Sequence, residues 1–360
     1  MGSLTEFLLG LKEVHETLAE SGLPVYLYGT GDGADKISAY LESHGVKISG
    51  VFCSEGFVRD REYRGFRVQS LEEVERKEKK IAAVLCFGLE PEECDAATDR
   101  LREHLFLAPA VPVYGDTVID RAFVREHSEA IERVYEKLSD GLSKELYRRV
   151  LAYSVTGEPA YLLCGDERAE NTLPAGYYDH ASGHIDVGAF DGDTALAYLQ
   201  GNPRVRKITA FEPDEATFRK LCRKTEGLPV EAVHAAVSDR AENAGFAGGK
   251  GRGSHLVSGA GGINVVTLDG FFGFPFVSSH GEEIGSIKVD AEGMDKEVLC
   301  GAANLITACR PAVCVSAYHR GEDLTELPLL LKRLDYRSAL FFRKKRCIPA
   351  WDTVFCLIPQ

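Results

Sequence analysis

The sequence predicts an α/β protein with two doubly wound domains joined by helices. Two stretches alternate short apolar strands with amphipathic helices, and each has a glycine-rich turn directly after a strand. The chain has 360 residues, which is long for one domain and sufficient for two that each bury a core. We therefore expect a small α/β domain over residues 1–115, a helical connector over 116–160 and a second α/β domain over 161–360.

The N-terminal domain is predicted to open with one amphipathic helix over residues 4–21 and to continue with a βαβ unit over residues 25–53. Gly29, Gly31 and Gly33 form the turn between the first strand and its helix. This turn resembles a dinucleotide-binding fingerprint.

The acidic partner of that fingerprint is missing from its usual place. Cys53 and Ser54 end the second strand where a ribose-binding Asp or Glu is expected, and Glu55 comes one or two positions late. Two interpretations stay open: a site for a nucleotide or nucleotide-sugar, or a tight turn required by packing in a domain that orients or oligomerises the protein.

The connector is predicted from a heavily charged helical pattern with an apolar stripe over residues 118–156. No Pro/Gly/Ser-rich linker interrupts it, so we expect a fixed arrangement of the two domains.

Charge and composition exclude several classes of protein. The net charge of −13 argues against a nucleic-acid-binding surface, and the dense basic run Arg343–Arg346 is interpreted as a solvated turn between two strands. No apolar run is long enough to span a bilayer and no signal-peptide pattern is present, so a cytoplasmic location is expected. The ten cysteines lack CxxC spacing and are interpreted as reduced, structural residues.

The most informative stretch of the second domain is HIDVGAFDGDT, residues 184–194. A short apolar strand meets a turn containing Gly188 and Gly192, and a helix follows. Glycine lets the backbone approach a ligand closely, and the helix start presents free N–H groups.

The carboxylates in this turn indicate which ligand it binds. Asp186, Asp191 and Asp193 would repel a pyrophosphate but could accept hydrogen bonds from the ammonium group of an amino acid. The turn therefore suits S-adenosylmethionine better than a dinucleotide.

Polar residues at the ends of the next strands extend this predicted cofactor site. Glu212 follows the second strand, where an adenosine ribose can be held through its hydroxyls. Ser238 and Asp239 follow the third strand, predicted over residues 230–237, where an adenine edge would lie. A glycine-rich segment, residues 245–262, is expected to form an exposed excursion or short hairpin.

Three further polar residues should meet at the same edge of the sheet. Asp290 and Glu292 follow the fourth strand, ahead of a helix predicted over residues 295–305, and His319 follows the fifth. Each residue alone is compatible with a structural role, but their convergence on one crevice indicates that at least one acts in chemistry.

The second domain resembles the FkbM family of S-adenosylmethionine-dependent methyltransferases from about Tyr177 to the end of the chain. The motifs that carry the resemblance are HIDVGAFDGDT, AFEPDEATFRKL, HAAVSD, VTLD, IKVDAEGMDKEVLCGA and the closing YRSALFFR…WDTVFCLI hairpin. The resemblance implies a Rossmann-like class I methyltransferase sheet of seven strands in the order 3-2-1-4-5-7-6, with the last strand reversed. It also implies O-methylation, often of sugars or polyketide-type products. The N-terminal domain resembles more loosely the small Rossmann-type domains of sugar-modifying enzymes.

Methyl transfer to a hydroxyl requires a base near the attacking oxygen, or a metal that lowers its pKa. We expect His319 to be that base, because its ordinary pKa near 6.5 suits the task. Asp290 is the second candidate, and Glu292 would orient the acceptor or join Asp290 on a divalent ion. Two carboxylates and a histidine are also an ordinary polar pocket, so no residue is assigned to a metal.

The expected acceptor is a small molecule or carbohydrate, with no nucleic-acid or membrane partner and with homo-oligomerisation left open. Two alternatives remain: an NAD(P)- or nucleotide-sugar-binding enzyme that uses the N-terminal domain, and a non-catalytic scaffold with a methyltransferase fold.

Overall fold

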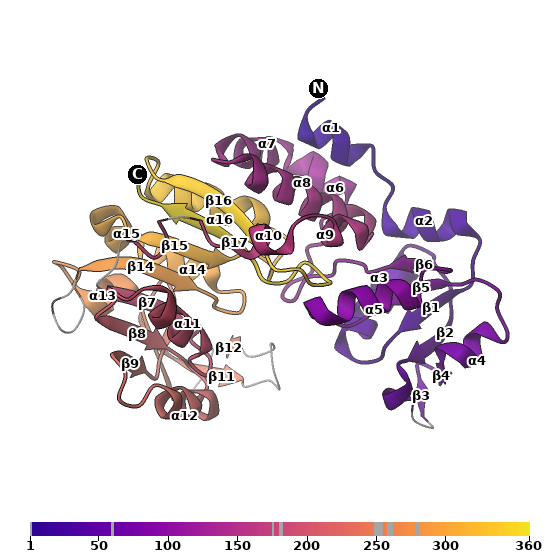
Figure 1. Cartoon of the computed structure of the whole chain (residues 1–360), viewed down its shortest axis with the longest axis horizontal. Helices are drawn as coiled ribbons and strands as arrows, with labels where there is room; N and C mark the ends of the chain where they lie inside the picture. Colours follow the sequence, from indigo (N-terminus) through magenta and orange to yellow (C-terminus); the bar gives the residue numbers. More distant parts are fainter. Residues whose placement is uncertain are drawn as a thin grey trace.

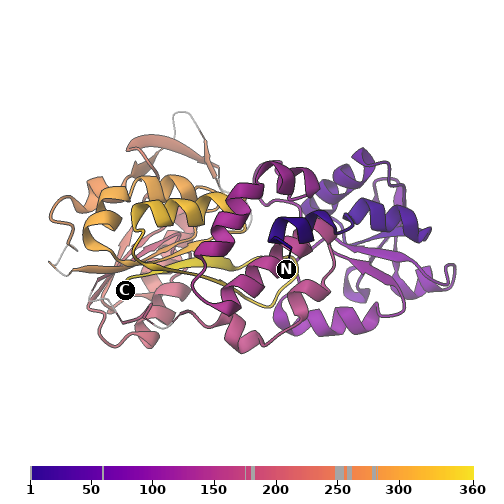
Figure 2. The same cartoon turned by 90° about the horizontal axis from the view of Figure 1, so that it is seen from above.

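A computed structural model describes residues 2–58, 61–174, 176–179, 183–247, 255–257, 262–277, 281 and 283–360. Two α/β units lie at opposite ends of an elongated molecule, with helices packed between them (Figures 1 and 2). The closing β-hairpin extends from the C-terminal unit toward these helices (Figure 1). Both sheets are mostly parallel, as the strand and helix alternation predicted.

The N-terminal sheet has six strands in the order β3-β4-β2-β1-β5-β6. Its neighbours pair in parallel except for β3 and β4. The strands are β1 (Val25–Tyr28), β2 (Ile48–Cys53), β3 (Glu62–Tyr63), β4 (Phe66–Ser70), β5 (Ala82–Leu85) and β6 (Leu105–Leu107). The helices of this unit are α3 (Asp32–Ser43), α4 (Leu71–Glu75) and α5 (Pro91–Arg100), with a 3-10 turn at Glu55–Phe57.

The single N-terminal helix predicted over residues 4–21 is wrong, because the chain forms α1 (Leu4–Leu9) and α2 (Val14–Ser21). Gly10 caps the first helix, and Glu13 starts the second with a capping box to Glu16. Apolar spacing continues through the break, so periodicity alone did not detect it. Helix α1 lies beside the connector helices (Figure 1), where Thr5 donates to Glu132 through its backbone N–H and its hydroxyl.

The connector is helical, as predicted. Its helices are α6 (Arg121–Glu126), α7 (Ser128–Lys137) and α8 (Gly141–Thr156), and the short helices α9 (Ala160–Leu163) and α10 (Glu167–Asn171) follow. Helix α8 is buried along most of its length between its neighbours.

The interpretation of Arg343–Arg346 as a solvated turn is wrong. Arg343 and Lys344 are buried at the end of a strand, where they pair with Asp140 and Glu170 of the connector region. Lys345 and Arg346 instead pair with Glu90 and Asp95 of the N-terminal unit. The run therefore connects the closing hairpin to the connector region and to the N-terminal unit through ion pairs. The sequence alone could not show this, because the acidic partners are distant in sequence.

The C-terminal sheet has seven strands in the order β16-β17-β15-β14-β7-β8-β9. This is the order 3-2-1-4-5-7-6 expected from the resemblance, with β17 antiparallel to both of its neighbours. The strands are β7 (Gly183–Val187), β8 (Lys207–Phe211), β9 (Val230–Val233), β14 (Ile284–Val289), β15 (Ala312–Ser316), β16 (Ala339–Lys344) and β17 (Thr353–Ile358). The strand order reverses between β7 and β14, which places a ligand crevice outside their carboxyl ends.

Six helices accompany this sheet: α11 (Asp193–Gly201), α12 (Glu215–Lys224), α13 (Leu268–Phe272), α14 (Asp295–Cys300), α15 (Ala303–Cys309) and α16 (Asp323–Leu334). The helix predicted over residues 295–305 is interrupted at Gly301. A Cβ at this glycine would lie 2.1 Å from the carbonyl oxygen of Ser238, so only glycine fits there.

The predicted strand over residues 230–237 is also interrupted. After β9 the chain forms β10 (Ala236–Val237), which joins a small sheet with β11 (Glu242–Ala247), β12 (His255–Val257) and β13 (Ile263–Val266). Strands β11 and β12 pair in antiparallel fashion, as in the hairpin alternative for the glycine-rich segment. Residues 248–254 and 258–261 of that segment lie outside the described residues.

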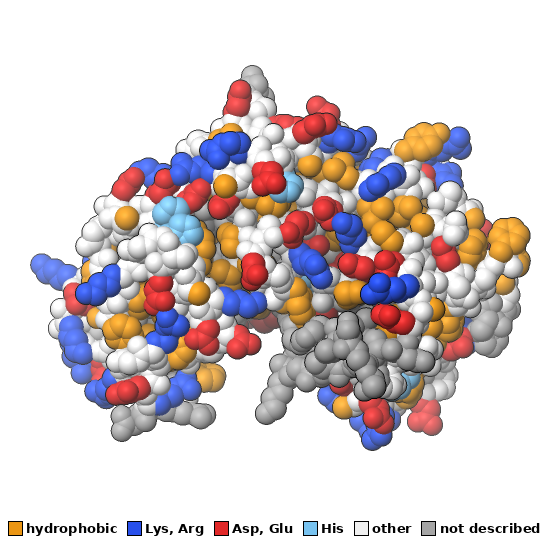
Figure 3. All heavy atoms as spheres, turned by 180° about the vertical axis from the view of Figure 1, so that it is seen from behind, with side chains coloured by type: hydrophobic (Ala, Val, Ile, Leu, Met, Phe, Trp, Pro, Cys, Tyr) orange, Lys and Arg blue, Asp and Glu red, His pale blue; other side chains and the backbone are white. Residues whose placement is uncertain are grey.

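Acidic and basic side chains are interspersed over the described part of the face in Figure 3, where they form no continuous basic stripe. Within the described residues, no helix has the length and apolar content needed to cross a membrane. All ten cysteines are free thiols, six of them buried.

Candidate active site

The turn after β7 is locked between two neighbouring strands. The N–H groups of Gly188 and Ala189 both donate to the carbonyl oxygen of Phe211, at 3.1 and 3.0 Å. Gly188 has φ +72°, and a Cβ on it would lie 1.9 Å from the carbonyl oxygen of Asp290. Glycine is therefore required both by the left-handed backbone and by the contact with the β14 loop.

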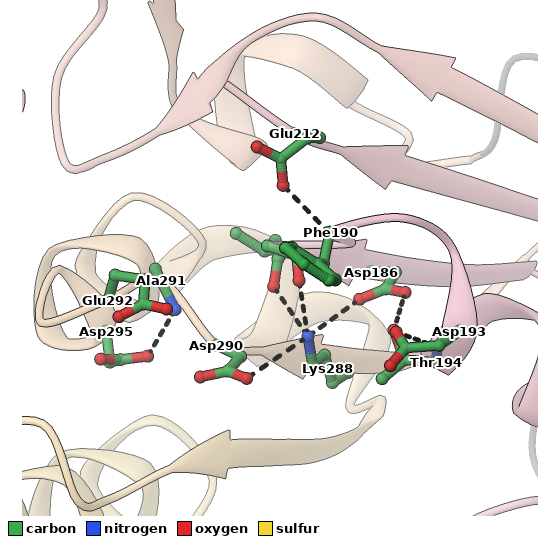
Figure 4. A network of polar contacts seen from close by, with 12 residues as sticks. Asp186, Phe190, Asp193, Thr194, Glu212, Lys288, Asp290, Ala291, Glu292 and Asp295 are labelled. Carbon is green, nitrogen blue, oxygen red and sulfur yellow. Dashed lines mark hydrogen bonds and ion pairs between the residues drawn. The ribbon is translucent and has the colours of Figure 1, made fainter. Parts of the chain in front are cut away.

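Asp186 lies below this turn and has no exposed surface. It accepts a hydrogen bond from the Thr194 hydroxyl at 2.6 Å and pairs with Lys288 at 3.3 Å (Figure 4). Lys288 also donates to the carbonyl oxygen of Gly188 at 2.8 Å and lies 3.9 Å from Asp290. Burial opposes the charge of Lys288, but Asp186 and Asp290 outweigh it and raise its pKa.

Lys288 therefore ties the predicted cofactor turn to the acidic residues after β14. The sequence-based account did not assign it a role. A lysine inside a strand predicted to be buried was the available signal, because such a charge needs a partner.

Glu212 lies at the carboxyl end of β8, beside the turn. Its carboxylate accepts hydrogen bonds from the backbone N–H groups of Phe190 and Asp214, at 3.0 and 2.8 Å. Burial raises the pKa of Glu212 to about 7, and the two N–H donors only partly offset this effect. Phe190 itself has φ +48° and is 55% exposed, so an unusual backbone conformation presents an aromatic ring at the turn.

The remaining predicted cofactor residues have other described contacts. Asp191 pairs with Lys224 of α12 at 2.6 Å, and Gly192 has φ +92° where the turn enters α11. Ser238 is buried after β10 and donates to Asp239 at 3.2 Å. Among the described contacts, none links Ser238 or Asp239 to Glu212.

Asp290, Glu292 and His319 do meet at one edge of the sheet, as expected. Nε2 of His319 lies 3.4 Å from Asp290 Oδ1 and 3.8 Å from Glu292 Oε2. On the other side of the ring, Nδ1 lies 2.8 Å from Asp295 Oδ2. The sequence analysis did not assign Asp295, because a carboxylate at the start of a helix has an ordinary explanation.

The environment of His319 differs from the expectation of an unperturbed pKa. The side chain is fully buried, which by itself would lower its pKa. The charges of Asp295, Asp290 and Glu292 outweigh burial and raise the pKa of His319 to about 9. The carboxylates around His319 therefore stabilise a positive charge at this position.

The segment that follows the N-terminal sheet contributes a wall of this cluster. The Tyr114 hydroxyl donates to Glu292 at 3.2 Å, and its backbone N–H donates to the carbonyl oxygen of His319 at 2.9 Å. Tyr318 lies on the other side, with its hydroxyl 3.4 Å from Asp290. Tyr114 is distant in sequence from the residues it contacts, so no motif indicated its role.

The glycine turn of the N-terminal unit is packed against protein atoms. A Cβ at Gly29 would lie 2.6 Å from the Phe87 ring, and one at Gly33 would lie 2.3 Å from the carbonyl oxygen of Cys86. Asp32 and Asp35 occupy the first turn of the following helix, where they disfavour a phosphate. These contacts favour the interpretation that packing requires Gly29 and Gly33, whereas nothing lies within 4 Å of a Cβ placed on Gly31.

Comparison with known proteins shows which family this part of the sequence is similar to. Residues 186–338 match the family model described as the methyltransferase FkbM domain. The match shows similarity to the FkbM methyltransferase family over less than half of the chain. The FkbM domain begins at Asp186, includes Glu212 and the cluster around His319, and ends before β16.

Solved structures extend the similarity to the whole chain. Methyltransferase FkbM from Methylobacillus flagellatus KT is similar over 98% of this chain and 97% of its own, with a TM-score of 0.67 and 17% sequence identity. At this identity the similarity establishes the fold, and it includes the N-terminal unit together with the FkbM domain.

Weaker similarities involve about half of the chain. The methyltransferase domain of bacterial CtHen1-C has a TM-score of 0.30 and 12% identity, over 51% of this chain and 92% of its own. A putative rRNA-methylase from Clostridium thermocellum has a TM-score of 0.30 and 8% identity, over 49% and 87%. No curated protein matches the sequence.

Proposed function

We propose that this protein is an S-adenosylmethionine-dependent O-methyltransferase that acts on a hydroxyl group of a small molecule or carbohydrate. The observation that carries the proposal is the FkbM domain match, which includes both the turn at Gly188 and the cluster around His319. Both lie outside the carboxyl ends of neighbouring strands, where open α/β sheets bind their ligands.

The residues at the turn fit such a cofactor. Gly188 lets the backbone approach a ligand, and Glu212 offers a carboxylate at the end of β8 for the ribose hydroxyls. The two N–H groups bonded to Glu212 hold its carboxylate in place beside the turn. Asp186 and Lys288 support the turn from below, as Figure 4 shows.

The cluster around His319 then serves the acceptor. When bound, S-adenosylmethionine would supply an electrophilic methyl group by cleavage of its sulfonium S–CH₃ bond, while the acceptor hydroxyl supplies the electron pair and releases its proton to water at the open side of the cluster. Asp290 and Glu292 have side chains that are 31% and 35% exposed, so an acceptor can reach them. Asp295 and Tyr114 keep this cluster in place from behind. We propose that the N-terminal unit and connector position the wall that contains Tyr114.

Cofactor affinity should depend on the ionisation of Glu212. With its pKa raised to about 7, Glu212 gains its charge between about pH 6 and pH 8. A carboxylate accepts hydrogen bonds from ribose more strongly than the neutral acid. We expect the affinity for S-adenosylhomocysteine, measured by calorimetry, to rise up to roughly tenfold over this range. Glu212→Gln should bind more weakly and show a flat profile.

Glu215→Gln is the matched control, since Glu215 lies three residues away, is exposed and pairs with Arg219. It should keep both the affinity and the pH profile of the parent protein. A parent protein whose affinity does not change with pH would contradict the role of Glu212, as would equal losses in the two variants.

A further inference from the structure

We propose that His319, Asp290 and Glu292 bind a divalent transition-metal ion at the acceptor side of the site. The metal-binding claim rests on the geometry of these residues, and only its role in activating a hydroxyl rests on the proposed function. The first observation is the buried Nε2 atom of His319, which makes no hydrogen bond with any described residue.

The other ring nitrogen of His319 has a hydrogen-bond partner. Nδ1 of His319 donates to Asp295 Oδ2 at 2.8 Å. The carboxylate of Asp295 also accepts from the N–H groups of Ala291 and Gly293, at 2.9 and 3.2 Å. Both oxygens of Asp295 are therefore engaged, and this residue orients the ring from behind. Carboxylates commonly play this part behind metal-binding histidines.

Nε2 faces two other carboxylates at distances that suit a shared ion. It lies 3.4 Å from Asp290 Oδ1 and 3.8 Å from Glu292 Oε2. Two ligand atoms that are each about 2.1 Å from one ion lie about 3.0–4.2 Å apart, depending on the angle between them. A proton on Nε2 would leave a buried N–H group without a hydrogen bond, whereas a cation would pair with this nitrogen and with the carboxylate oxygens beside it. Asp290, Asp295 and His319 also offer one ligand atom each within 4.8 Å of one another.

The charges of the cluster also favour a cation. Asp290, Glu292 and Asp295 bring three carboxylates to one imidazole, and the nearby Lys288 is shared with Asp186. Among the described contacts, these three carboxylates therefore outnumber the cationic groups beside them. A divalent ion would neutralise that excess.

The ligand set indicates the kind of ion. One imidazole nitrogen with two carboxylate oxygens suits Mn²⁺ or Zn²⁺ better than Ca²⁺, which prefers oxygen ligands alone. The partial exposure of Asp290 and Glu292 leaves an open side for water or an acceptor oxygen. An acceptor hydroxyl bound to the ion would have a lowered pKa and would release its proton to water as the methyl group is transferred.

The test is a titration of the metal-stripped full-length protein with Mn²⁺, with free Mn²⁺ followed by electron paramagnetic resonance. We expect one Mn²⁺ to bind per chain, and at least a tenfold loss of affinity in Glu292→Gln and in Asp290→Asn. Glu297→Gln is the matched control, because Glu297 lies on the adjacent helix α14 outside the cluster. It should bind Mn²⁺ like the parent protein.

Calorimetry with S-adenosylhomocysteine on the same samples shows that the variants are folded and keeps the two proposals separate. Failure of the parent protein to bind Mn²⁺ while it binds S-adenosylhomocysteine would overturn the metal site. Equal losses of Mn²⁺ affinity in Glu297→Gln and Glu292→Gln would overturn it too. Binding of Mn²⁺ without S-adenosylhomocysteine would support the metal site and contradict the proposed function.

Discussion

Gly188→Ala should destabilise the protein by more than about 4 kcal/mol and abolish binding of S-adenosylhomocysteine. The new Cβ would lie 1.9 Å from the carbonyl oxygen of Asp290, so the ends of β7 and β14 would have to separate. The left-handed backbone, φ +72°, adds its own cost for an alanine. We expect the thermal midpoint to fall by at least about 5 °C, with calorimetry detecting no binding of S-adenosylhomocysteine by the folded protein below the midpoint.

Gly227→Ala is the matched control for this prediction. Gly227 has φ +76°, similar to Gly188, but nothing lies within 4 Å of the position where a Cβ would be. It should cost about 1–2 kcal/mol from backbone strain alone and leave binding intact. Equal, small decreases of the thermal midpoint in both variants would show that the close contact with Asp290 does not constrain the turn.

Glu170→Ala should cost about 3–5 kcal/mol of unfolding free energy, because it leaves two buried cations without their carboxylate. Glu170 pairs with Arg149 at 2.7 Å and with Lys344 at 3.1 Å, and all three side chains are at most 5% exposed. Among the described contacts, Arg149 and Lys344 would keep carbonyl partners such as Tyr161 and Leu162. Thermal denaturation followed by circular dichroism measures the effect.

Glu90→Ala removes the carboxylate partner of Lys345, which follows Lys344 in the basic run. Glu90 pairs with Lys345 at 2.7 Å, but its side chain is 56% exposed. An exposed pair contributes about 0–1 kcal/mol, and the capping box that Glu90 forms at the start of α5 contributes about 0.5–2 kcal/mol, so this variant should lose clearly less stability than Glu170→Ala. If Glu170→Ala were as mild as Glu90→Ala, the buried cluster would not hold β16 to the connector region.

The sequence predicted those parts of the fold that depend on local periodicity and on motif order. The strands before Gly29 and Gly188 each combine an apolar run with a glycine turn, and both form as expected. Periodicity failed where a tertiary contact interrupts a regular element. The helix breaks at Gly301, where the Ser238 carbonyl oxygen leaves no room for a side chain, and a single sequence does not place that carbonyl beside it.

The site residues that directly follow strands could be predicted from the sequence, but the residues that support them could not. Parallel strands bring Asp290 and His319 to one edge, so their meeting followed from the order of the strands. Asp295 and Tyr114 depend on loop conformation and on the position of a distant segment. The expectation of an ordinary pKa for His319 failed for the same reason, because the shift comes from carboxylates in these loops.

The most direct test of the central claim is hydrogen exchange of the full-length protein with and without S-adenosylhomocysteine. The claim is that the turn after β7, and not the first glycine turn, holds the cofactor. It predicts slower exchange of backbone amides in residues 188–194 and 212–214 when the ligand is present. Unchanged exchange there, with protection confined to residues 29–34, would contradict the claim and place the ligand in the N-terminal unit.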